Sequence, residues 1–375
     1  MKRLSKPLSW LGGAAVAALV LAVPAVANAE DFDLDALIAA AKAEPPLNVY
    51  DSTGKIVDQA KNFTAEYGVQ ATGTKIKPAA SLEMVIREAQ AHNVQADVIM
   101  LSDPAAAMAQ LLPEKFVYSW VPPDIEDKID PLYRDPLVLT NSANVWAYNT
   151  ELFDKCPVTN IWQLTEPEWK GKVAMQDPLG KASYDSWFNQ TAMHADDKIA
   201  AAYKAQYGKD LETDEDSATK AWVKALAANS PLLTDADEAA AQAAGAPGQK
   251  EPFMALISSA KFRDNQDMGY KLGLCSGMEP YSGWLSPNMG LIASGTDSPN
   301  AAKLFIRYML TKDGIAPQAE DGKRSTNGDL NLPDDEPSGV GKVWDEMQPY
   351  DVSTAGDDWD TREDWQDFWR LNYKK

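Results

Sequence analysis

The sequence is poor in cysteine and histidine, with two residues of each among its 375 positions. It has no C-x-x-C motif, and His92 and His194 lie far apart in the chain, which excludes a zinc site of the usual spacing. The motifs G-x-S-x-G, G-x-x-x-x-G-K-S/T and H-E-x-x-H are absent as well. We therefore expect no catalytic residues, no bound metal, no cofactor and no enzymatic activity.

Positive charge is also scarce, because the chain has 35 Lys and Arg but 55 Asp and Glu, which gives a net charge of −20. Such a chain repels the phosphates of nucleic acids and of anionic membranes, so we expect neither as a partner. An apolar content of 45% is typical of a globular protein. The length exceeds that of one ordinary core and predicts two lobes.

Long hydrophobic runs are missing after residue 30, so no later segment is predicted to span a bilayer. The long run at 11–26 follows three positive residues and precedes the A-x-A sequence at 27–29. This order is typical of a signal peptide, and the missing stop-transfer flank argues against a membrane anchor. We predict that residues 1–29 are removed and that the protein is exported to the periplasm.

The two cysteines, Cys156 and Cys275, lie in separate segments of the chain. An exported protein resides in an oxidising compartment, which favours a disulfide between them. Two buried free thiols are the alternative. A bridge would join distant parts of one lobe.

Three strand–loop–helix units follow a first amphipathic helix at 30–43. The predicted strands are 47–50, 69–77 and 96–101, and the helices after them are 56–67, 82–92 and 105–112. Successive units of this kind predict an α/β fold with a parallel sheet and right-handed crossovers. The polar residues after the strands would then meet at one edge of the sheet: Ser52, Thr53, Ser81, Ser102 and Asp103. Each of these residues alone is also explained as a helix cap.

A second group of elements begins with a long strand at 137–149, interrupted at 140–142, that we interpret as the crossing between two lobes. The later predicted strands are 173–175, 252–257, 270–275 and 289–293, the last being the return crossing. Short helical pieces are predicted at 149–153 and 161–164, and an amphipathic helix at 301–311. A poorly hydrophobic loop follows at 321–341, and a packed terminal helix carries the tryptophans near the C-terminus.

The stretch 170–186 is predicted to be a strand, a tight loop and a helix start near 182–186. Asp177 and Pro178 end the strand, and Gly180 permits close approach of a ligand to the backbone. Ser183 and Asp185 are N-cap residue types. A helix N-terminus after a strand offers free N–H groups to an anion. A plain connection with nothing bound is the alternative.

Further polar and aromatic residues complete the predicted ligand site. Lys181 adds one positive charge, and several residues supply hydroxyl groups, carboxylates or rings for stacking: Ser142, Asp177, Asp235, Ser258, Tyr281 and Trp284. Core packing is the competing explanation for the aromatic residues.

The order of these pieces resembles a periplasmic solute-binding protein of an ABC importer. The motif at 169–178, W-K-G-K-V-A-M-Q-D-P, is similar to one found in the branch that includes ferric-iron, thiamine, phosphonate and hexose-phosphate binders. Further segments carry the resemblance: 47–50, 96–98, 145–150, 298–305 and 312–314. The resemblance implies two α/β lobes joined by two crossing strands, a small-molecule solute between them, an ABC permease of the inner membrane as partner, and a monomer.

The resemblance also implies lobe boundaries. Lobe one would comprise 30–141 and 286–330, lobe two 142–285, and a C-terminal extension 331–375.

The departures from this branch bear on the ligand. Ferric-iron binders place two adjacent tyrosines where this chain has Ser258-Ser259, and serine does not supply the anionic oxygen that ferric iron prefers. Hydroxyl groups and helix N-termini suit a small anionic solute, so a sugar phosphate or phosphonate is preferred. The alternatives are ferric iron or a polyamine on the same scaffold, or an exported hydrolase.

Overall fold

The structure is a computed structural model that describes residues 32–374. The predicted signal peptide and cleavage site lie outside the described residues. From Leu34 onward the chain forms one compact unit. None of its described helices has the length and apolar character needed to cross a membrane.

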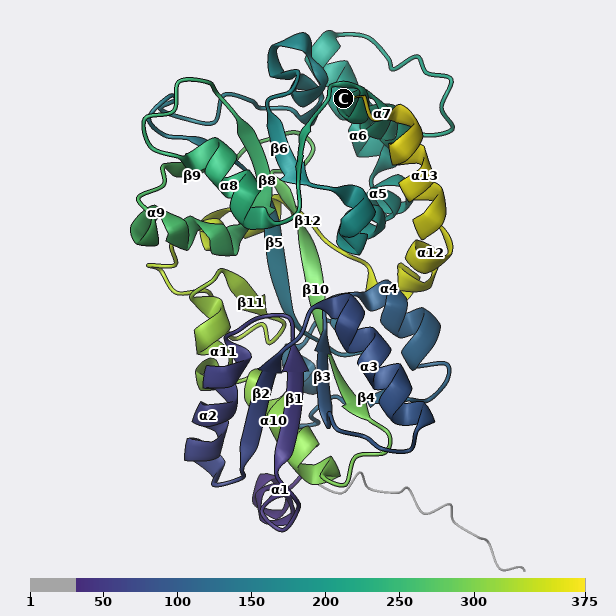
Figure 1. The fold of residues 1–375 in the computed structure, drawn as a ribbon, viewed down its shortest axis with the longest axis vertical. Helices are drawn as coiled ribbons and strands as arrows, with labels where there is room; N and C mark the ends of the chain where they lie inside the picture. Colours follow the sequence, from purple (N-terminus) through teal and green to yellow (C-terminus); the bar gives the residue numbers. More distant parts are fainter. Residues whose placement is uncertain (1–31, 375) are drawn as a thin grey trace, which may run out of the picture. The chain divides into compact units, whose positions relative to one another are not determined.

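The first part of the chain forms three β–α units, as the sequence predicts. Its elements are α1 (Leu34–Ala41), β1 (Leu47–Asp51), α2 (Ile56–Tyr67), β2 (Ala71–Lys75), α3 (Pro78–Gln90), β3 (Val98–Leu101), α4 (Pro104–Ala106), a π-helix η1 (Ala107–Leu111) and β4 (Val117–Ser119). β1 pairs in parallel with both β2 and β3. α10 (Pro299–Met309) and α11 (Lys312–Ala319) return to this part, which we call the first lobe (Figure 1).

The second lobe contains the middle of the chain. Its elements are the 3₁₀ helices η4 (Ile161–Thr165), η5 (Pro167–Trp169) and η6 (Pro178–Gly180), β6 (Val173–Gln176), α5 (Ala182–His194), α6 (Asp196–Tyr207), α7 (Ala218–Ala228), β7 (Leu232–Thr234), α8 (Asp237–Gly245), β8 (Met254–Ser258), η7 (Ser259–Arg263), α9 (Asp264–Asp267) and β9 (Leu272–Leu274). β6 pairs in parallel with β7 and β8.

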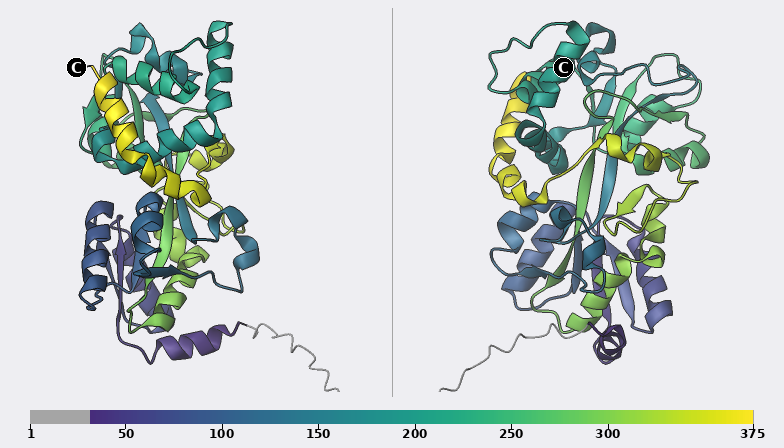
Figure 2. Two further views of the ribbon diagram at one scale, coloured as in Figure 1. Left: turned by 90° about the vertical axis from the view of Figure 1, so that its right-hand side faces the viewer. Right: turned by 180° about the vertical axis from the view of Figure 1, so that it is seen from behind.

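Two long antiparallel strands, β5 (Val138–Asn149) and β10 (Gly283–Ala293), run through both lobes (Figures 1 and 2). They join the lobes into one sheet with the order β2-β1-β3-β10-β5-β8-β6-β7. Gly283 lies where they approach most tightly, since a Cβ there would fall 2.2 Å from the carbonyl oxygen of Asn144. Any side chain at this position would push the crossing strands apart.

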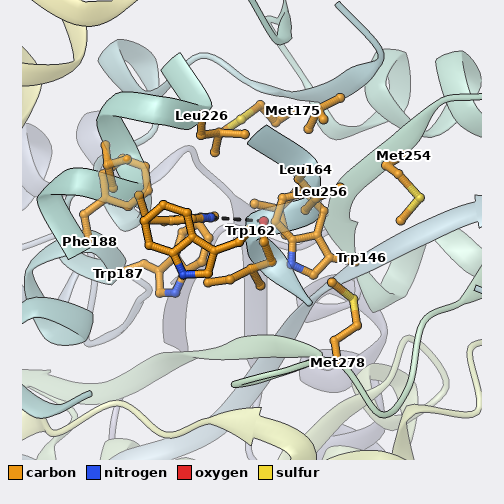
Figure 3. Close-up of a cluster of buried hydrophobic side chains, with 14 of the residues drawn as sticks. Trp146, Trp162, Leu164, Met175, Trp187, Phe188, Leu226, Met254, Leu256 and Met278 are labelled. Carbon is orange, nitrogen blue, oxygen red and sulfur yellow. Dashed lines mark hydrogen bonds between the residues drawn. The ribbon is translucent and has the colours of Figure 1, made fainter. Parts of the chain in front are cut away.

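Both faces of the sheet are covered in each lobe. In the first lobe, Val98–Leu101 is buried throughout, as expected for a parallel strand between two helical layers. In the second lobe, one face holds a tryptophan-rich cluster that includes Trp146, Trp162 and Trp187 (Figure 3). The opposite face is lined by small alanines that let α8 approach the sheet.

The chain ends in a segment that packs beside the crossing strands. Its elements are a 3₁₀ helix η8 (Val340–Glu346), β12 (Met347–Gln348), a 3₁₀ helix η9 (Val352–Thr354), α12 (Ala355–Asp360) and α13 (Arg362–Asn372). β12 pairs with β10, and α13 packs on α5 and α7.

Several predicted boundaries differ from the structure. α3 begins at Pro78, four residues before the predicted start, because proline fits the first turn of a helix. β5 is one unbroken strand, and β10 begins at Gly283 rather than 289. The predicted helical piece at 149–153 is a turn. The predicted loop 321–341 contains a short strand, β11 (Lys323–Ser325), which pairs with β5.

Cys156 and Cys275 form a disulfide, as the export prediction favoured. The bridge connects the segment after β5 to the end of β9, and the Cys275 N–H donates to the Trp146 carbonyl at 2.9 Å. It closes a sequence separation of 119 residues. A cross-link of this span restricts the unfolded chain strongly.

Replacing both cysteines in the variant C156A/C275A is expected to lower the free energy of unfolding by about 3–5 kcal/mol, because the unfolded chain regains its loop entropy. Guanidinium unfolding of the two proteins measures the difference. Reductant should shift the midpoint of the wild type and leave that of the variant unchanged. Equal midpoints for oxidised wild type and variant would contradict a stabilising bridge.

Candidate functional site

Two serine hydroxyls meet at the carboxyl edge of the first lobe. β1 and β3 are parallel neighbours, so the residues that follow them emerge on the same edge. Ser52 Oγ and Ser102 Oγ lie 3.5 Å apart, and both residues are half-buried. Thr53 follows Ser52, and its hydroxyl accepts the Lys55 N–H at 3.3 Å. We call Ser52, Thr53, Ser102 and Asp103 the first rim.

The buried carboxylate of Asp51 holds the first rim in place. Asp51 is 1% exposed and accepts hydrogen bonds from the Ser52 N–H (2.6 Å), the side chain of Asn288 (3.3 Å) and that of Gln318 (2.9 Å). Burial raises the pKa of Asp51, and the positive charge of Lys323 opposes that rise. These contacts fix the Ser52 turn against both β10 and α11.

Lys323 lies beside the first rim, a position that the sequence did not reveal. It lies on β11, opposite Ser142 of the crossing strand β5, and Ser142 also faces Ser286 of β10. Within residues 32–374, the Lys323 ammonium forms no ion pair, although its charge acts on Asp51. The low hydrophobicity of 321–341 predicts a loop, so only the long-range pairing of β11 places this lysine near the first rim.

Two predicted rim residues have other surroundings. Ser81 lies inside the first turn of α3 rather than at its cap, is 2% exposed, and its hydroxyl has no partner in the described part of the chain. Asp103 is the true N-cap of α4, where it accepts the Ala106 N–H at 3.1 Å. Its carboxylate also binds Arg362 of α13, so it is not a free anion.

The second rim follows β6 in the second lobe and consists of Asp177, Gly180, Lys181 and Ser183. Asp177 caps η6 by accepting the Leu179 N–H at 3.0 Å, and Gly180 is exposed. Helix α5 starts at Ala182, as predicted, so Ser183 lies in its first turn instead of at its cap. Lys181 pairs with Asp237 at 3.2 Å and lies over the Tyr184 ring. Its charge is therefore already compensated.

The remaining second-lobe residues follow β7 and β8. Asp235 is exposed, and its carbonyl accepts the Gln176 side chain at 3.4 Å. Ser258 caps η7 by accepting the Ala260 N–H at 3.4 Å. Close by, Lys261 is bound to Glu238.

The two predicted stacking aromatics have other partners in the structure. Trp284 is 2% exposed in the second-lobe core and stacks on Trp187 at 5.5 Å between ring centroids. Tyr281 accepts a hydrogen bond from Lys198 of α6 at 2.7 Å. Stacking on a solute would require both residues to leave these partners. The competing explanation, core packing, holds for Trp284.

A surface pocket of about 400 Å³ lies elsewhere, between α5, α7 and α13. Trp365, Phe368 and Lys220 line part of it, and its lining includes none of the predicted ligand-binding residues. In the described part of the chain, no three His, Cys, Asp or Glu side chains are grouped as metal ligands.

The sequence profile of bacterial extracellular solute-binding proteins matches residues 47–324, about three quarters of the chain. The chain belongs to this family. The resemblance inferred from the sequence is thereby confirmed. An extracellular solute-binding protein is the component of an ABC importer that captures the solute, so family and fold are those of binding proteins. No curated protein sequence matches this solute-binding protein.

Solved structures share the fold of this solute-binding protein at low sequence identity. Iron-bound HitA from Pseudomonas aeruginosa has a TM-score of 0.65 and 15% identity, over 87% of this chain and 99% of its own. AfuA from Actinobacillus pleuropneumoniae, with fructose-6-phosphate bound, has a TM-score of 0.63 and 19% identity, over 87% of this chain and 98% of its own. The substrate-binding protein of an ABC transporter from Agrobacterium tumefaciens has a TM-score of 0.66 and 12% identity, over 90% of this chain and 97% of its own. The predicted two-lobed binding-protein fold is confirmed.

Burial raises the pKa of one carboxyl beside the second rim. Asp185, in the first turn of α5, is fully buried; its Oδ2 accepts the Gln366 side chain at 2.9 Å, and Oδ1 has no partner among the described residues. Burial raises its pKa to about 7, and the negative charges of Asp103 and Asp177 add to the rise, while Gln366 and Arg362 oppose it.

Asp185 should make the solute-binding protein less stable as pH rises. The folded state binds this proton more tightly than the unfolded state, so its contribution is full below pH 4 and is lost as pH rises through 7. The variant D185N keeps an acceptor for Gln366 and does not titrate. At pH 8 we expect it to be more stable than wild type by on the order of 2–4 kcal/mol, with the difference shrinking toward pH 5.

Urea unfolding at a series of pH values measures this difference. D364N, which changes an exposed carboxyl on α13, is the matched control and should follow the wild-type curve. A D185N curve parallel to wild type between pH 5 and 8 would show that Asp185 is ionised throughout.

Proposed function

We propose that this solute-binding protein captures a small anionic solute, a sugar phosphate or a phosphonate, in the periplasm and delivers it to an ABC permease. In this proposal residues 1–29 are the signal peptide, and the mature chain acts as a monomer with the predicted lobe boundaries. The solute binds between the first and second rims.

The proposal rests on the combination of hydroxyl groups and the Lys323 ammonium at the first rim. Ser52 and Ser102 present paired hydroxyls, and Lys323 adds a positive charge that is not neutralised by an ion pair within the described residues. Three other cations near the rims are already bound: Lys181 to Asp237, Lys261 to Glu238, and Arg362 to Asp103. Hydroxyl and ammonium donors match the oxygens of a phosphate or phosphonate.

The second rim contributes backbone donors to the same solute. α5 is long enough to carry a helix dipole, and its first turn follows Lys181 directly. A phosphate held near Ser183 would meet free N–H groups at the positive end of that dipole.

The chemistry at the end of β8 argues against ferric iron. Ser258 caps η7. Ser259 is 1% exposed, and its hydroxyl donates a hydrogen bond to the Asp321 carbonyl at 3.4 Å. Neither hydroxyl provides an anionic oxygen.

Binding of hexose phosphates, 2-aminoethylphosphonate, spermidine and ferric citrate to the mature protein tests the ligand class. We expect a phosphate or phosphonate to raise the melting temperature, since a ligand specific for the folded state stabilises it. A shift with ferric citrate alone, accompanied by a visible charge-transfer band, or with spermidine alone, would refute the anion proposal. Hydrolysis of the phosphate ester would instead indicate an exported hydrolase.

Variants then test the residues. Each of S52A and S102A should weaken binding of the active anion roughly 5- to 10-fold, and K323Q at least about tenfold, because each removes a donor to a charged oxygen. Calorimetric titration measures these affinities. K61Q, which neutralises an exposed lysine on α2, is the matched control and should bind like wild type. Unchanged affinity in K323Q would place the anion elsewhere.

A further inference from the structure

The C-terminal segment 347–373, which we call the strap, contacts both lobes beside the crossing strands. β12 pairs with β10 at Gly283 and Trp284, and the chain then continues through α12 and α13. α12 packs on α4 and η1 of the first lobe and on α5 of the second, and α13 packs on α5 and α7 (Figure 1). The strap is therefore a further connection between the lobes, in addition to β5 and β10.

A buried carboxylate fixes the strap to the second lobe. Asp358 is fully buried and accepts hydrogen bonds from Asn189 (2.8 Å), Gln190 (3.1 Å) and the Tyr350 hydroxyl (2.5 Å). Gln190 also accepts the Asp351 N–H at 2.9 Å. A buried network in which the partners satisfy one another specifies one position for the strap on α5.

A second buried contact reinforces this position. The Gln348 side chain accepts hydrogen bonds from the Trp187 indole (3.2 Å) and the Thr191 hydroxyl (3.0 Å). It follows that both β12 and α12 are bound to the same helix of the second lobe.

Arg362 of the strap binds the first lobe. The Arg362 guanidinium donates two hydrogen bonds to Asp103, from Nη2 to Oδ1 at 2.7 Å and from Nη1 to Oδ2 at 3.2 Å. The two side chains are only 16% and 15% exposed. A two-bond Arg–carboxylate pair has a defined orientation, and shielding from water strengthens it.

One turn of α13 reaches both rims. Arg362 and Gln366 are four residues apart and lie on the same face of the helix. Arg362 binds Asp103 of the first rim, while Gln366 binds Asp185, which lies two residues beyond Ser183 of the second rim. The strap thus connects the end of β3 to the start of α5 through two neighbouring side chains.

We propose that the strap is a latch that holds the two lobes in a fixed relative position on this side of the crossing strands. Arg362 joins it to the first lobe, and Asp358 with Gln348 joins it to the second. Arg362 is thereby a positioning residue: it sets the spacing between the rims through Asp103. The inference is independent of the chemical class of the solute.

Distance measurements between the lobes of the ligand-free mature protein test the latch. Spin labels at K61C on α2 and K250C, both exposed positions, report one distance across the lobes by electron–electron double resonance. In this background we expect R362Q to widen the distance distribution or shift its mean. D103N should do the same, and it keeps an oxygen to cap α4.

R370Q is the matched control, because Arg370 lies on the same helix and pairs with Asp367, three residues away on that helix. Its distribution should equal that of the parent. The charge exchange D103R/R362D should restore a narrower distribution than either single substitution. Distributions for R362Q and D103N that match R370Q, with circular dichroism showing that both variants are folded, would overturn the latch.

Discussion

The antiparallel pairing of β5 with β10 is the constraint on which the rest of the structure depends. The two strands face each other from Val145 opposite Gly283 to Val138 opposite Met289, and both lobes add their own strands to this pair. The first rim follows strands attached to β10, and the second rim follows strands attached to β5 through β8. The separation of the rims is therefore a property of the crossing strands and of whatever else bridges the lobes.

Asp51 connects the first rim to this central pair. Its carboxylate accepts from Asn288 on β10 and from the backbone of Ser52, so the rim cannot move without disturbing a buried polar network. The raised pKa of Asp51 reflects the cost of keeping a carboxylate in that position. Lys323 offsets part of this cost and at the same time supplies the positive charge beside the rim.

Local patterns predicted most of the fold, because each β–α unit carries its own periodicity and its own turn residues. The sequence places the start of α3 too late, because Ser81 is of a cap residue type, whereas Pro78 begins the helix. The site was predicted less well. Lys323 reaches the rim only through pairing of β11 with a strand some 180 residues earlier. Trp284 of β10 is buried in a cluster that includes Trp187 of α5, more than 90 residues earlier in the chain.

Helix α5 shows why local sequence patterns do not predict function. The polar residues Asn189, Gln190 and Thr191 by themselves favour an exposed surface. In the structure all three are buried. The polar groups are buried because the strap binds there through Gln348 and Asp358, between 157 and 169 residues later in the chain. A helix whose polar face is matched by a distant segment has a partner that periodicity does not encode. Here that partner also contacts the first lobe, so the same polar face that looks unremarkable in sequence determines how the two rims are held.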